Sequence, residues 1–170
     1  MNNLKTLIAY ASKHGSTAEI AKAIHEVLNK SGITTVISAA RDVIDLKAYG
    51  AVVLGSAIYM DNWQKDAIHF VKRFKNELSE RPVWLFQAGP FEDLAVIPGK
   101  PLAARSAALL HTLNIRGFIT FGGKLTKETS GLIERIMVNK GMSGDFRDFD
   151  RIRAWADTIA GELLPNRKIN

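Results

Sequence analysis

The chain contains no cysteine among its 170 residues. This absence excludes disulfides, thiolate-ligated zinc, iron–sulfur clusters and cysteine nucleophiles. No stretch approaches the roughly 18 consecutive apolar residues of a membrane-spanning helix, and the N-terminus has neither a cationic leader nor a small-residue cleavage pattern. We therefore expect a cytoplasmic protein with an apolar core, in which any redox chemistry comes from a bound cofactor.

Charge of one sign is not concentrated anywhere in the sequence. Lysine and arginine number 23 against 17 acidic residues, a formal net charge of +6, and the excess is spread thinly along the chain. A positive balance favours anionic partners, but a nucleic-acid-binding protein would gather it on one stripe, so we expect no nucleic-acid partner. The length and the 46% hydrophobic content predict a single domain over residues 1–170.

Apolar runs alternate with helical periods along the chain. The runs typical of strands cover residues 4–10, 34–38, 51–55, 83–86 and 118–121, and the helical periods cover 16–30, 67–78, 102–113 and 152–164. The runs at 51–55 and 83–86 are continuous rather than alternating, which indicates strands buried on both faces of a sheet. This pattern predicts an α/β fold with a five-stranded parallel, doubly wound sheet and helices on both faces.

Doubly wound sheets bind ligands beyond the carboxyl ends of their strands. The segment after the first strand reads Ser12, Lys13, His14, Gly15, Ser16, Thr17. A glycine, three hydroxyls and the unpaired N–H groups of a helix start coincide there, which predicts a phosphate site. An ordinary helix cap by Ser16 or Thr17 is the alternative. The segment lacks the glycine patterns of dinucleotide-binding folds and of P-loop NTPases.

This segment resembles the flavodoxin-like family, whose first loop reads T/S-x-x-G-x-T. Ser12, Gly15 and Thr17 match that pattern, whereas Lys13 and His14 stand where the family usually has hydroxyls or small residues. The resemblance implies a flavodoxin-like fold that binds flavin mononucleotide (FMN) through this loop. The two departures add positive character beside a phosphate, which should not impair binding.

Two further segments follow central strands, and under this resemblance they would hold the flavin ring. Both combine small residues with bulkier ones: Ser56, Ala57, Ile58, Tyr59 and Trp63 in the first, and Gln87, Ala88, Gly89, Pro90 and Phe91 in the second. Tyr59, Trp63 and Phe91 could stack on the ring, and small residues let backbone amides approach its polar edge. For Trp63, capping the core is an equal alternative, and residues 87–91 could form a plain turn.

Residues 55–63, 121–125, 134–148 and 149–160 resemble more narrowly the flavodoxin-type, menaquinone-dependent protoporphyrinogen dehydrogenases, which carry an insert after the fifth strand. Residues 124–148 occupy that position. The resemblance implies an FMN-dependent oxidoreductase that passes electrons from protoporphyrinogen IX to a quinone at the membrane surface. Tyr59 stands where that branch has an arginine, which leaves the porphyrin substrate open. A one-electron carrier is the alternative function, although typical carriers are strongly acidic, and a flavin-free α/β domain is the third hypothesis.

Within the insert, apolar residues at helical spacing predict a short amphipathic helix with basic residues elsewhere around it. The apolar face holds Leu132, Ile133, Ile136 and Met137, and the basic residues are Lys127, Arg135 and Lys140. Residues 127–140 could contact an anionic membrane, although packing onto the domain is the favoured interpretation. Residues 144–150 are expected to form a turn and cap whose acids are structural. No metal site and no catalytic side chain is indicated, because His25, His69 and His111 lack ligand-spaced partners.

Overall fold

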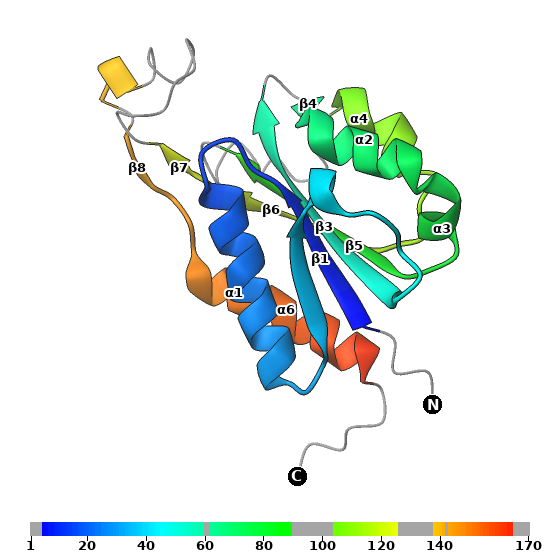
Figure 1. Ribbon diagram of the computed structural model, residues 1–170. Coiled ribbons are helices and arrows are strands. Elements are labelled where there is room, and N and C mark those ends of the chain that lie inside the picture. The colour runs from blue at the N-terminus through cyan, green and yellow to red at the C-terminus, as the bar shows by residue number, and fades with distance from the viewer. Residues whose placement is uncertain (1–4, 60–61, 90–103, 126–137, 142, 165–170) are drawn as a thin grey trace.

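The computed structural model describes residues 5–59, 62–89, 104–125, 138–141 and 143–164 (Figure 1). Its main sheet contains β1 (Lys5–Ala11), β2 (Thr35–Ala39), β3 (Tyr49–Tyr59), β5 (Val83–Gly89) and β6 (Ile115–Gly122) in the order β2-β1-β3-β5-β6. Every neighbouring pair in that order is parallel. The predicted doubly wound, five-stranded parallel sheet is therefore confirmed.

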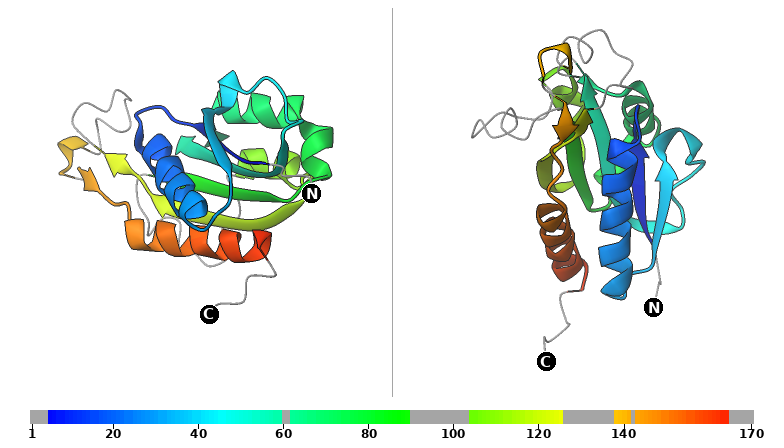
Figure 2. Two further views of the ribbon diagram at one scale, coloured as in Figure 1. Left: turned by 60° about the horizontal axis from the view of Figure 1, so that its bottom comes forward. Right: turned by 90° about the vertical axis from the view of Figure 1, so that its left-hand side faces the viewer.

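Helices cover both faces of this sheet, as the left view of Figure 2 shows. One face carries α1 (Ser16–Lys30) and α6 (Phe149–Leu163), and the other carries α2 (Lys65–Arg73), α3 (Lys75–Ser79), α4 (Ala104–Leu110) and the 3₁₀ turn η1 (Ala40–Asp42). Successive strand residues point to opposite faces. Leu7 and Ala9 accordingly enter the core beneath α2, whereas Ile8 enters the core beneath α1.

The helix predicted over 67–78 is divided in the structure. Phe74 leaves helical geometry at φ −110° and ψ 23° and separates α2 from α3. Its buried ring packs edge-on against Phe70, with centroids 5.1 Å apart, and Leu78 is buried in the same core. Because the apolar spacing continues unchanged across the break, periodicity alone could not reveal it.

The two central strands run further than the apolar runs predicted. Residues 56–59, expected in a loop, continue β3, and residues 87–89 continue β5. Ser56 pairs with Gln87 and Ala57 with Ala88 in the parallel ladder, while the short strand β4 (Asn62–Trp63) turns back antiparallel to the end of β3. The loop assignment was therefore wrong, because polar and small residues at the sheet end still satisfy their backbone groups in the ladder.

After β6 the chain forms a second, two-stranded sheet. In it β7 (Lys124–Leu125) pairs antiparallel with β8 (Gly144–Asp145) beside the start of α1 (Figure 1). Residues 144–145 are therefore strand rather than the expected turn. Asp148 does cap α6, accepting a hydrogen bond from the Arg151 N–H at 3.0 Å, as the sequence predicts. The amphipathic helix expected at 132–137 lies outside the described residues.

Candidate functional site

The three segments singled out in the sequence meet at one edge of the sheet. Ala11 at the end of β1 pairs with Ser56, Ala57 pairs with Ala88, and Gly89 pairs with Gly122 at the end of β6. Residues 12–17 leave β1 at this edge and lead into α1. The carboxyl ends of β1 and β3 flank the position where the strand order reverses, which is the ligand position in open α/β sheets.

Gly15 sets the shape of the loop between β1 and α1. It has φ +86°, a left-handed conformation that favours glycine, and its N–H donates to the Ser12 hydroxyl at 3.0 Å. A Cβ there would meet nothing within 4 Å, so glycine is required by the backbone conformation and not by crowding. Lys13 and His14 are exposed on the same loop.

The N-terminus of α1 has no side-chain cap. Gly15 occupies the cap position, so neither Ser16 nor Thr17 caps the helix as the ordinary-cap alternative required. The Ser16 hydroxyl is screened from solvent and has no hydrogen-bond partner within the described part of the chain. An unsatisfied buried hydroxyl is costly, and a helix N-terminus attracts anions. The loop thus offers what a phosphate requires.

Gly123 closes this loop from the side of β6. A Cβ on Gly123 would lie 3.8 Å from the Ser16 hydroxyl oxygen and only 2.6 Å from the Gly89 carbonyl oxygen. The chain after β6 thus passes close to both the end of β5 and the first turn of α1. Sequence reasoning did not assign this residue to the site, although two successive glycines directly after a strand are a signal for close backbone approach.

Several predicted ring-binding residues hold the strand ends together instead of facing outward. The buried Ser56 hydroxyl donates to the Ala57 carbonyl and accepts from the Gln64 N–H, both at 2.9 Å. The Trp63 indole, 3% exposed, donates to the Gln87 side-chain oxygen at 3.1 Å. In this structure Trp63 therefore lies in the core, as its alternative interpretation required.

Other predicted residues stay at the sheet edge or lie outside the description. Ala57 and Ile58 are half-buried at the end of β3, while Ala88 is 6% exposed and Gly89 is also buried. Pro90, Phe91 and the side chain of Tyr59 lie outside the described residues. Among the residues predicted to hold the ring, those that the structure describes therefore form the sheet edge chiefly with their backbone, at the ends of β3 and β5.

Arg147 is a residue near the site that sequence reasoning missed. Its guanidinium donates to both oxygens of Asp145 on β8, at 2.5 and 2.7 Å, and also contacts Glu19 in the first turn of α1. These hydrogen bonds lower the pKa of the Asp145 carboxyl and raise that of Arg147. Arg147 and Glu19 are 128 positions apart, so no local pattern could have joined them.

A family model described as "Flavodoxin domain" matches residues 7–151. The chain belongs to the flavodoxin domain family. Membership implies FMN as the cofactor, and the uncapped helix start fits a phosphate group, because its Ser16 hydroxyl has no partner among the described residues. Among curated proteins nothing matches. The more specific protoporphyrinogen dehydrogenase branch is not supported by any of these matches.

Solved structures with the same fold include flavodoxins and a larger enzyme. A flavodoxin from the domain Archaea matches with a TM-score of 0.65 at 14% identity, over 94% of this chain and 99% of its own. Flavodoxin 2 from Bacillus cereus matches at 0.64 and 19% identity, over 93% and 99%. The rubredoxin:oxygen oxidoreductase of Desulfovibrio gigas matches at 0.62 and 15% identity, over 97% of this flavodoxin domain but 37% of that chain.

The described part of this flavodoxin domain has neither a cluster of metal ligands nor a membrane-spanning helix. Across residues 5–59, 62–89, 104–125, 138–141 and 143–164, no three His, Cys, Asp or Glu side chains gather where they could hold a metal ion. No helix in these ranges has the length and apolar content needed to cross a membrane. His25 bonds the Thr35 hydroxyl at 2.7 Å, whereas His69 and His111 are exposed.

Proposed function

We propose that this chain is an FMN-dependent oxidoreductase whose phosphate site is the segment Ser12–Thr17. The observation that carries the proposal is the uncapped start of α1, where the Ser16 hydroxyl, beside the left-handed Gly15, has no partner in the part of the chain that the structure describes. The N–H groups of the first helical turn and the hydroxyls of Ser12, Ser16 and Thr17 would hold the phosphate. The exposed Lys13 and His14 add positive character beside it.

The flavin supplies electron transfer when bound, and the chain's own residues would position and shield it. The backbone of residues 56–59 and 87–89 lies at adjacent strand ends, where amides can meet the polar edge of the ring. Pro90 and Phe91 come next in the sequence after β5, and we expect Phe91 to stack on the ring. The hydrogen bonds among Ser56, Gln64, Trp63 and Gln87 hold these strand ends in place. Trp63 and Gln87 thus support the ring site from within the core.

Transfer to a quinone, with a porphyrinogen as one candidate donor, is the finer part of the proposal. Strands β7 and β8 flank residues 126–143 in the sequence, and Arg147, after β8, contacts Glu19 in the first turn of α1. A segment inserted at this point of the sequence could help to bind a substrate, and residues 127–140 are the candidate for peripheral membrane contact. The net charge of +6 also differs from the acidic surface expected of a carrier for basic reductases.

A one-electron carrier is the second candidate. It is favoured by the matches to flavodoxins, which extend over nearly the whole of their chains. A carrier binds FMN and exchanges single electrons with protein partners, so it needs no small-molecule substrate site.

One experiment separates the two candidates. The FMN-loaded protein is mixed with a water-soluble menaquinone analogue and with reduced porphyrin or nicotinamide donors, and quinone reduction is followed under anaerobic conditions. Saturable turnover supports the oxidoreductase. Absence of turnover, together with stepwise reduction in two well-separated one-electron stages, contradicts it and supports the carrier.

A further inference from the structure

Arg147 joins the two-stranded sheet to the helix that begins at the proposed phosphate site. Its guanidinium lies between the carboxylates of Asp145 and Glu19, and its side chain is 5% exposed. Glu19 belongs to the first turn of α1, and its N–H donates to the Gly15 carbonyl at 3.0 Å. Glu19, in the helix that begins at the proposed phosphate site, is thus paired with Arg147, which follows β8.

Glu19 has opposite effects on the helix and on an anion bound at its start. A carboxylate in the first turn is stabilised by the positive end of the helix dipole. The same carboxylate repels a phosphate bound at those N–H groups, and a phosphate monoester carries about two negative charges at neutral pH. With Arg147 present, the cluster of Glu19, Asp145 and Arg147 has one net negative charge; without Arg147 it would have two.

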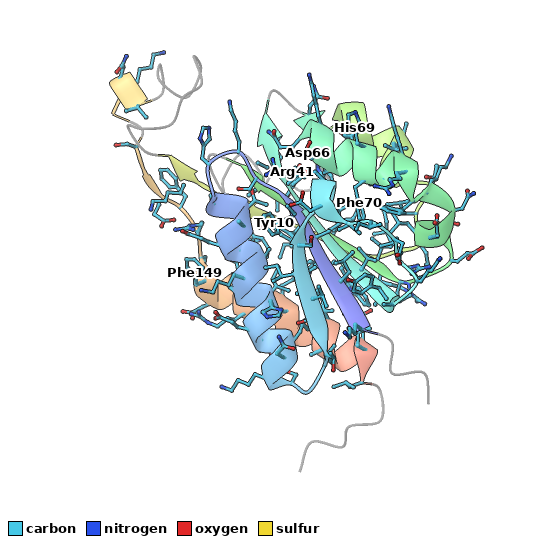
Figure 3. All side chains as sticks on the ribbon, in the orientation of Figure 1. Tyr10, Arg41, Asp66, His69, Phe70 and Phe149 are labelled. Atoms are coloured by element: carbon cyan, nitrogen blue, oxygen red, sulfur yellow. The ribbon has the colours of Figure 1, made fainter. Side chains whose placement is uncertain are left out.

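The arginine is held in place by its surroundings and not only by charge. Its guanidinium carbon lies 5.1 Å from the centre of the Phe149 ring, which Figure 3 labels where the chain enters α6. The residue before Arg147, Phe146, donates its backbone N–H to the Gly123 carbonyl at 3.0 Å, and a Cβ on Gly123 would lie 3.8 Å from the Ser16 hydroxyl oxygen. The Glu19 side chain, by contrast, is 57% exposed. The fixed partner is therefore Arg147.

We propose that Arg147 is a positioning residue for the phosphate site, which holds the Glu19 carboxylate and offsets its charge so that a phosphate can bind at the start of α1. This inference rests on the proposed function, since it concerns the phosphate of FMN. It assigns the segment after β8 a part in cofactor binding, through charge and without direct contact with the ring.

The test compares FMN with riboflavin, which has the same ring and side chain but no phosphate. Their Kd values are measured by quenching of flavin fluorescence for the parent protein, Arg147→Gln, Glu19→Gln and the double variant. The readout is the ratio of the two affinities, which a general loss of packing would leave unchanged. Arg153→Gln is the matched control, because it removes an arginine from an exposed ion pair with Asp150 on α6.

We expect Arg147→Gln to lower the preference for FMN over riboflavin roughly five- to tenfold, the scale of one unit charge near a partly exposed site. Glu19→Gln should raise it, and the double variant should return to within about twofold of the parent, because its cluster again has one negative charge. Arg153→Gln should leave the ratio unchanged.

Three results would overturn the inference. An equal loss of affinity for FMN and for riboflavin in Arg147→Gln would mean a structural role alone. A preference for FMN in the double variant that stays as low as in Arg147→Gln would mean that the guanidinium acts on the phosphate itself. If Arg147→Gln does not fold, an unchanged ratio in Glu19→Gln is sufficient to contradict it. A parent protein that binds no FMN instead contradicts the proposed function.

Discussion

The indole N–H of Trp63 donates to the side-chain oxygen of Gln87 across the ends of β4 and β5, at 3.1 Å between two buried side chains. The amide nitrogen of Gln87 in turn donates to the Thr120 hydroxyl on β6 at 3.0 Å. A chain of side-chain hydrogen bonds, buried at Trp63 and Gln87 and half-buried at Thr120, therefore joins three strands beneath the edge at which we place the flavin ring. Fully satisfied networks of this kind favour one arrangement of the groups that they connect.

Replacing Gln87 with leucine should destabilise the protein by about 1–3 kcal/mol, because it leaves the buried Trp63 N–H and the half-buried Thr120 hydroxyl without their partner. Urea unfolding measures this change. In a protein that already carries Trp63→Phe, the same leucine substitution should lower the free energy of unfolding by less, because the indole N–H that it would leave unpaired is already absent. Strictly additive effects of the two substitutions would contradict the coupling.

Gly122→Ala should displace the segment after β8. A Cβ on Gly122 would lie 2.0 Å from the Phe146 carbonyl oxygen, which is backbone and cannot turn aside. We expect a loss of about 1–3 kcal/mol of stability and faster proteolysis near residues 143–148. The control is Gly161→Ala in α6, where a Cβ meets nothing within 4 Å and helix propensity should stabilise by about 0.5–1 kcal/mol. Equal effects at both positions would refute this explanation.

The pairing of Asp145 with Arg147 predicts a specific pH dependence. Hydrogen bonds from Arg147 lower the pKa of the Asp145 carboxyl below 3.8 in the folded protein. The carboxylate therefore stabilises the fold above pH 3.8, and this contribution is lost as the pH falls through the lowered folded-state pKa. Melting temperatures of the parent and Asp145→Asn should differ near neutral pH and converge in acid. A difference in melting temperature that grows as the pH falls would contradict this prediction.

Much of the fold could be predicted because the continuous apolar runs of the central strands indicate that both faces of these strands are buried. The runs at 51–55 and 83–86 lie in strands buried on both faces, and the apolar period from Ile20 to Leu28 marks the face of α1 that packs on the sheet. The strand ends were harder to predict. Ser56 and Gln87 look like loop residues, yet both remain in the ladder, where the Ser56 hydroxyl accepts from the Gln64 N–H and the Gln87 side chain accepts from Trp63, 24 positions away.

The candidate site divides in the same way between local and distant relationships. The phosphate segment 12–17 is local, since a glycine, hydroxyls and a helix start follow one another along the chain. The approach of Gly123 to Ser16 and the contact of Arg147 with Glu19 depend on how β7 and β8 return to α1. Only the folded chain brings these residues together, so no spacing rule could indicate them.

The measurement that tests the central claim most directly is the visible absorption spectrum of the protein after incubation with FMN and removal of the excess, beside that of Gly15→Asp. The matched control is Gly32→Asp at the other end of α1, where glycine also has a positive φ of 87°. We predict flavin bands in the parent and in Gly32→Asp, and their loss in Gly15→Asp. A colourless parent, or flavin retained by Gly15→Asp, would contradict the assignment of residues 12–17 as the phosphate site.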